Sequence, residues 1–169
     1  MGCEDQTVRI ISLDPDSTLE TISLQALTSP PSSICIVDML DAGINRNQPT
    51  VFVNIGLQTG VLLRTVLDPV SGQLTDTRTR WVFSRTPKRS YQLYRAHRFL
   101  GTRPVRLIRV QVKSQPAILA LSSRTWLNYT HQNLMHFTPL IFDPLDYSWS
   151  FSAELCPEGL IGITGNVLR

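Results

Sequence analysis

The sequence of 169 residues is poor in charge, in aromatic side chains and in cysteine. Only 17% of its residues are charged and 8% are aromatic, while 42% are hydrophobic, which excludes a disordered acidic tail and a coiled coil. No apolar run approaches the roughly 18 residues that cross a bilayer, so we expect no membrane-spanning helix. The three cysteines lie far apart and form no C-x-x-C pair, which argues against a disulfide framework and a zinc site. The first residues lack the basic and then apolar pattern of a secretory signal, so we expect the cytosol or the nucleus.

Acidic residues are missing from one long stretch of the chain. Residues 77–142 hold 12 of the 16 Lys and Arg residues and no Asp or Glu. A basic block of this kind suits a phosphate backbone or an acidic protein surface. The alternative is a set of solvated strand faces that share one sign of charge, because no base-reading motif accompanies the block. Both interpretations stay open at this point.

The patterns that carry catalysis are also missing. The three histidines have no metal-ligand spacing with a cysteine or with one another. Ser122 and Ser123 are not surrounded by a G-x-S-x-G elbow, and the loop 56–60 lacks the lysine of a phosphate-binding loop. We therefore expect no enzyme, no cofactor, no metal site and no small-molecule substrate.

What the sequence does contain is short runs of alternating and β-branched residues. No window longer than about ten residues shows a 3.6-residue apolar stripe, so we predict an all-β chain of antiparallel strands. Asp14–Ser17 and Gly56–Gly60 predict turns, and Ser29–Ser33 predicts a rigid connector because its two prolines cannot donate to a ladder. The predicted strands cover residues 7–13, 22–27, 34–37, 51–55, 61–67, 105–112, 117–121, 126–130 and 160–163.

One arrangement of strands repeats along the chain. Return strands begin with apolar residues at Val8, Val61, Trp126 and Val167, which gives intervals of 53, 65 and 41 residues. The middle interval becomes 47 if residues 81–98 are an insertion. A period of about 40–50 residues with several short strands is typical of β-propeller blades. About three such units do not close a ring, so we predict a partial propeller of two to three WD40-like blades, with residues 1–169 a fragment of a longer propeller domain.

Five arginines are the candidate contact for a polyanion or a protein partner. The strand 105–112 alternates in opposite phase in its two halves, and a bulge near Leu107–Ile108 would let Arg106 and Arg109 share the polar face. The densest basic positions outside residues 81–98 are Arg78, Arg80, Arg103, Arg106 and Arg109.

Several stretches of the chain resemble a known family in their turns as well as in their strands. These stretches are Thr7–Pro15, Val53–Val70, Asp76–Arg80, Leu100–Val105 and Leu155–Gly159. They resemble the family of the third subunit of splicing factor 3B, whose more distant members are the large subunits of the damage-specific DNA-binding complex and of the cleavage and polyadenylation specificity factor. The resemblance implies part of the second of three propellers.

By this resemblance the chain is a segment of a non-catalytic scaffold for nuclear pre-mRNA splicing in the branch-point-recognising subcomplex. Its implied partners are the other subunits of the splicing factor 3B complex, with RNA left open as a second partner. Two alternatives are a propeller adaptor of a DNA-damage, ubiquitin-ligase or polyadenylation complex, and a stand-alone nucleic-acid-binding protein that uses residues 77–142. The match at residues 53–70 favours the splicing member. Residues 81–98 have no counterpart in the family, so we predict an insertion that is either a loosely packed loop or translated intron.

Overall fold

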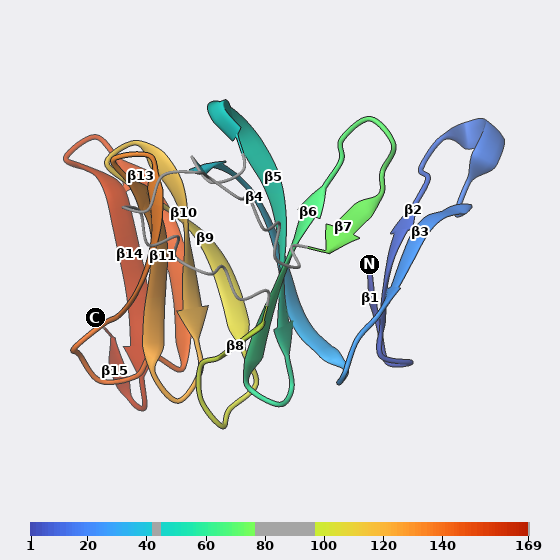
Figure 1. The fold of residues 1–169 in the computed structure, drawn as a ribbon. Helices are drawn as coiled ribbons and strands as arrows, with labels where there is room; N and C mark the ends of the chain where they lie inside the picture. Colours follow the sequence, from blue (N-terminus) through green and yellow to red (C-terminus); the bar gives the residue numbers. More distant parts are fainter. Residues whose placement is uncertain (42–44, 77–96, 169) are drawn as a thin grey trace, which may run out of the picture.

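The computed structural model describes residues 1–41, 45–76 and 97–168, which form four antiparallel sheets in chain order (Figure 1). A short 3-10 helix, η1 (Pro15–Ser17), follows the second strand. No helix in this described part of the chain is long and apolar enough to span a membrane. The first sheet holds β1 (Gly2–Cys3), β2 (Thr7–Ile11) and β3 (Thr21–Ala26). The second sheet holds β4 (Pro31–Asp41), β5 (Asn45–Leu57), β6 (Val61–Leu67) and β7 (Leu74–Asp76), and β8 (His97–Phe99) also pairs with β6. The third sheet holds β9 (Arg106–Val112), β10 (Gln115–Leu121), β11 (Thr125–His131) and β12 (Leu134–Pro139), and the fourth holds β13 (Tyr147–Ala153), β14 (Cys156–Thr164) and β15 (Val167–Leu168).

The prediction of an all-β partial propeller is confirmed. The sheets follow one another from the N-terminal to the C-terminal end of the chain and do not close into a ring (Figure 1). The predicted repeat is present at three of its four positions, because β6, β11 and β15 are each the third strand of their sheet and begin at or next to Val61, Trp126 and Val167. The fourth position, Val8, lies in β2, which is the second strand of the first sheet. Each sheet therefore repeats the same meander of neighbouring strands.

The strand boundaries differ from the prediction at the proline-rich connector. β4 begins at Pro31, inside the segment 29–33 that the prolines predict as a connector. β4 is the edge strand of its sheet and Pro31 is its first residue, so the missing N–H removes no ladder bond. The sequence analysis also leaves out five strands that the structure contains, namely β1, β7, β8, β12 and β13.

The predicted insertion 81–98 lies mostly outside the described residues. Its last two residues, His97 and Arg98, belong to β8, where His97 pairs with Leu63 and Arg98 with Leu62. The Arg98 guanidinium lies over the Phe137 ring of the third sheet, 4.6 Å from the ring centroid.

The core lies between the sheets. Successive residues of a strand point to opposite faces of its sheet, so one sheet can pack against a neighbouring sheet on each face. The first and second sheets bury Val8, Val53 and Ile55 between them. The second and third sheets bury Phe52, Val37, Met39 and Ile118 in one cluster, and Leu62, Val105 and Ala120 in another. On the side toward the fourth sheet the third sheet buries Val110, Leu119 and Leu121 with Leu145, which precedes β13.

The prediction of a bulge near Leu107–Ile108 is wrong. β9 and β10 pair without a register shift from Gln115↔Val112 to Leu121↔Arg106. In a regular strand, residues three apart point to opposite faces, so Arg106 and Arg109 do not share a face. Arg106 lies on the face toward the fourth sheet, whereas Arg109 faces the second sheet, where its charge acts on Cys35 of β4.

Candidate functional site

Two of the five predicted arginines come together at one end of the junction between the third and fourth sheets. Arg103 lies in the loop before β9 and Arg106 is the first residue of β9. Arg109 is on the other face of the same strand, and Arg78 and Arg80 lie outside the described residues. Of the five arginines, the structure brings Arg103 and Arg106 to one cavity and places Arg109 elsewhere, and it leaves Arg78 and Arg80 as a prediction.

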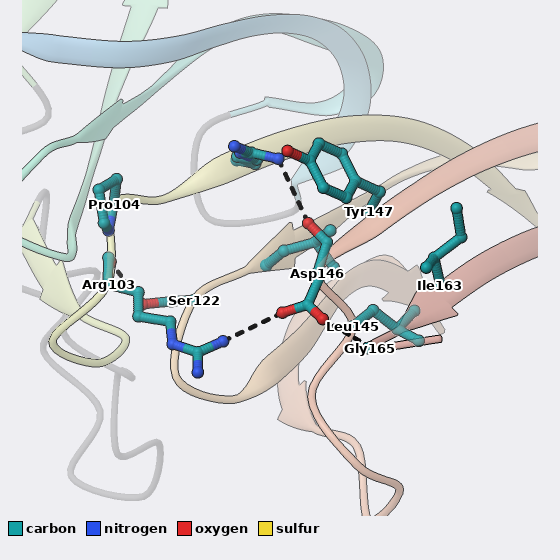
Figure 2. A pocket seen from close by; sticks show the side chains of 10 residues that line it. Arg103, Pro104, Ser122, Leu145, Asp146, Tyr147, Ile163 and Gly165 are labelled. Carbon is teal, nitrogen blue, oxygen red and sulfur yellow. Dashed lines mark hydrogen bonds and ion pairs between the residues drawn. The ribbon is translucent and has the colours of Figure 1, made fainter. Parts of the chain in front are cut away.

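These arginines line a cavity of about 370 Å³ (Figure 2). Its apolar part comes from Pro104 before β9 and Leu121 at the end of β10, together with Leu145 in the loop before β13 and Ile163 in β14. Its polar part comes from the arginines with Ser122, Asp146 and Tyr147. The size is at the lower end of ordinary ligand sites.

Asp146 makes hydrogen bonds to several of the groups around this cavity. Its carboxylate accepts a hydrogen bond from Arg103 at 3.2 Å and from the backbone N–H of Gly165 at 2.8 Å. Its own N–H donates to the Ile163 carbonyl at 2.8 Å. Figure 2 shows Asp146 between Arg103 and Tyr147, so one carboxylate joins the loop of the third sheet to the fourth sheet.

Arg106 makes two different contacts with the residues that start the fourth sheet. One guanidinium nitrogen donates to the Asp146 carbonyl oxygen at 3.3 Å. The guanidinium carbon lies 4.3 Å from the centroid of the Tyr147 ring, in the geometry of a cation–π pair. The side chain is thus held in place while it remains exposed to solvent.

The equivalent end of the junction between the second and third sheets is closed. There the residue before β9, Val105, is fully buried, and its carbonyl accepts from the hydroxyls of Ser32 at 2.6 Å and Ser33 at 2.7 Å. At this junction, serine hydroxyls at the start of the second sheet donate to the carbonyl of the residue before the third sheet. At the other junction, the Arg106 guanidinium at the start of the third sheet donates to the carbonyl of Asp146, the residue before the fourth sheet, and arginine is longer than serine. Arg106 lines the cavity at its junction, whereas Val105 is fully buried at the other.

The far end of the junction between the third and fourth sheets has a second acidic contact. The Glu158 carboxylate of β14 accepts from the backbone N–H of Lys113 at 2.8 Å and from that of Ser114. Both donors lie in the turn between β9 and β10 and have positive φ, 53° and 58°. The turn therefore presents two N–H groups that no ladder uses, and Glu158 satisfies them.

Asp146 and Tyr147 are members of the site that were not predicted from the sequence. The available signal is that acidic residues resume at Asp143 and Asp146, directly after the basic block. Within residues 1–41, 45–76 and 97–168, no cluster of three or more His, Cys, Asp or Glu side chains is suited to a metal ion. The geometry of the cavity, with two arginines over an apolar floor, suits the binding of an anionic group.

Comparison with known proteins identifies the class of fold. The chain matches the family described as RSE1/DDB1/CPSF1 second beta-propeller over residues 1–169. A match of this extent means that the chain belongs to this propeller family.

The similar proteins are splicing factors. The chain is 62% identical over its whole length to Pre-mRNA-splicing factor RSE1 of Mycosarcoma maydis, of which it covers 12%. It is 48% identical to Pre-mRNA-splicing factor rse1 of Neurospora crassa, of which it covers 12%, and 46% identical to Splicing factor 3B subunit 3 of Danio rerio, of which it covers 13%, again over the whole chain. The chain thus spans about an eighth of the length of these relatives.

Proposed function

We propose that the chain is a segment of a non-catalytic scaffold in nuclear pre-mRNA splicing, and that it acts through protein–protein contact within the splicing factor 3B complex. The observation that carries the proposal is the similarity to splicing factors over all 169 residues, at identities of 44% to 62%. The splicing names of these relatives favour this function over the adaptor and polyadenylation alternatives.

The placement of the basic residues supports protein contact over RNA contact. Arg106 and Arg109 point to opposite faces of the third sheet, and the charge of Arg103 is matched by Asp146. A phosphate backbone is held by several cations in a row, and these side chains do not form one.

Affinity purification of the epitope-tagged chain from nuclei tests the proposal. We expect the other subunits of the splicing factor 3B complex in the eluate, detected by mass spectrometry. A matched control is the same chain with Phe52→Ala, which disrupts the core and should recover none of them. Recovery of DNA-damage or polyadenylation subunits in their place would overturn the proposal.

A further inference from the structure

We propose that the cavity between the third and fourth sheets binds an acidic side chain of a protein partner, with an aliphatic side chain of the same partner lying beside it. This inference rests on the proposed function as a protein-binding scaffold, and it assigns that function to one place on the surface.

The charge balance of the cavity favours a single anionic group. Arg103 and Arg106 bring two positive charges and Asp146 one negative charge, which leaves one positive charge uncompensated among the lining residues. Each guanidinium has five N–H donors in a planar fork that matches a carboxylate. The Arg103 side chain is 62% exposed although it contacts Asp146, so it has donors that a ligand can reach.

The position of Arg106 is fixed before a ligand arrives. Its contacts with the Tyr147 ring and the Asp146 carbonyl hold the guanidinium at the rim of the cavity. A donor that is already ordered loses less conformational entropy on binding than a freely rotating lysine or arginine.

The floor of the cavity favours an aliphatic neighbour for that acidic group. Leu121 and Leu145 are buried, with 2% and 4% of their surfaces exposed, and Pro104 and Ile163 complete the apolar lining. An apolar group placed there leaves water, and each buried methylene contributes about 0.8 kcal/mol. A peptide that alternates acidic and aliphatic residues presents both chemistries at neighbouring positions.

RNA fits the surroundings less well, because the lining of the cavity includes no basic side chain besides Arg103 and Arg106, although Arg124 lies in the turn at the same end of the third sheet. Arg109 faces the second sheet, and Lys113 is in the turn at the opposite end of β9. Arg98 lies over Phe137 on the outer strands. A phosphate backbone carries a row of negative charges, whereas the two arginines and the Asp146 carboxylate leave one positive charge, which suits a single anionic group.

Fluorescence anisotropy with the whole chain tests this assignment. The probe is a labelled octapeptide of alternating Leu and Glu, and the comparison ligands are the same peptide with Gln for Glu and a labelled decauridylate RNA. We expect Arg106→Gln to weaken binding of the Leu-Glu peptide by about tenfold or more, because the variant loses a charge-assisted hydrogen bond to the peptide. Arg109→Gln, on the same strand but the opposite face, should leave it unchanged.

A second variant moves affinity in the opposite direction. Asp146→Asn removes the carboxylate that competes for Arg103, so we expect it to strengthen binding of the Leu-Glu peptide by about threefold. A variant that only damaged the fold would weaken binding, so a gain separates the site from general instability.

The outcomes that overturn the assignment are distinct. Equal losses in Arg106→Gln and Arg109→Gln would mean non-specific charge attraction, and tighter binding of decauridylate would make the cavity an RNA site. No binding of the Leu-Glu peptide, together with recovery of splicing subunits from nuclei, would overturn the cavity assignment and leave the proposed function standing. Peptide binding without those subunits would overturn the proposed function alone.

Discussion

The junction between the second and third sheets and the junction between the third and fourth sheets use the same strand positions with different chemistry. The first is apolar and closed, with Phe52 and Ile118 each 1% exposed. In the second, the buried residues of the segment 147–168 are two glycines: Gly162 lies against Leu145, and Gly159 lies against Phe151 of its own sheet. Of the large side chains of β13, Tyr147 contacts Arg106 of the third sheet, whereas Trp149 is 76% exposed.

This difference shows what holds each sheet in place. Large apolar side chains of both sheets attach the second sheet to the third. On its other face the third sheet buries Val110 and Leu119, and Asp146 and Glu158 of the fourth sheet and its preceding loop add hydrogen bonds to loops of the third. Surface charge contacts contribute little stability, typically less than about 1 kcal/mol each. The fourth sheet, which lines the cavity, contributes fewer buried side chains to its junction than the second sheet does, so we expect it to be held less firmly than the second sheet.

Removing a large side chain from each junction gives the largest expected contrast. Phe52→Ala should lower the free energy of unfolding by about 4 kcal/mol, since it opens a cavity in a dry core. Trp149→Ala should change it by less than about 0.5 kcal/mol, because most of that side chain is already in water. Urea unfolding followed by circular dichroism measures both values.

Equal losses in the two variants would mean that the exposed face of β13 is covered in solution. Repeating the unfolding at several protein concentrations would then show whether a second copy covers it, since self-association makes the apparent stability depend on concentration.

Glycine substitutions sharpen the same contrast at a smaller scale. A Cβ on Gly56 would lie 2.4 Å from the Val105 carbonyl oxygen, a backbone atom in the closed junction. A Cβ on Gly162 would lie 2.8 Å from a terminal methyl of Leu145, which can rotate away. We expect Gly56→Ala to cost about 2 kcal/mol and Gly162→Ala less than about 1 kcal/mol in urea unfolding. A larger loss in Gly162→Ala would show that Leu145 is as rigid as the backbone.

The fold could be predicted from the sequence to the extent that it depends on local patterns. Strand β6 runs from Val61 to Leu67 as predicted, and Gly60 has the positive φ, 79°, that its turn requires. β13 was not predicted, although its aromatic and serine residues alternate with the period of a strand. The start of β4 at Pro31 depends on its being an edge strand, which only the assembled sheet reveals.

The site was less predictable, because a stretch of like charges does not say which face each side chain takes. The choice between a bulge and a regular strand at Leu107–Ile108 decides whether Arg106 and Arg109 lie together. That choice depends on pairing with β10, a long-range property of the sheet. The partner of Arg103, Asp146, lies 43 residues further along the chain and directly before the fourth sheet, and the return of acidic residues after the basic block does not say which arginine they contact.

The thiols provide a third comparison of the same two regions. Burial in the closed junction raises the pKa of the Cys35 thiol, and the nearby Arg109 guanidinium opposes this only in part. Less of the Cys35 side chain is therefore thiolate at a given pH, while Cys156 on β14 is exposed. We expect iodoacetamide at pH 8 to modify Cys156 at least about tenfold faster than Cys35, as followed by peptide mass spectrometry. Comparable rates would show that the closed junction opens readily.

The smallest expected effect concerns the outer edge of the second sheet. Asp76 pairs with Thr65 and Phe99 with Val61, so three residues between them would form a regular strand along β6. Deleting residues 81–98 leaves four residues there, 77–80, one more than the strand needs, whereas deleting residues 80–98 leaves three.

We expect both deletions to change the free energy of unfolding by less than about 1 kcal/mol, because strand edges accommodate a single extra residue as a bulge and shortening a loop changes its closure entropy only slightly. The deletion of 80–98 should be the more stable of the two, since it leaves a regular ladder on β6. Urea unfolding compares them with the whole chain. A loss of several kcal/mol in both would mean that residues 81–98 are a structural part of the second sheet, and the prediction of an insertion would be wrong.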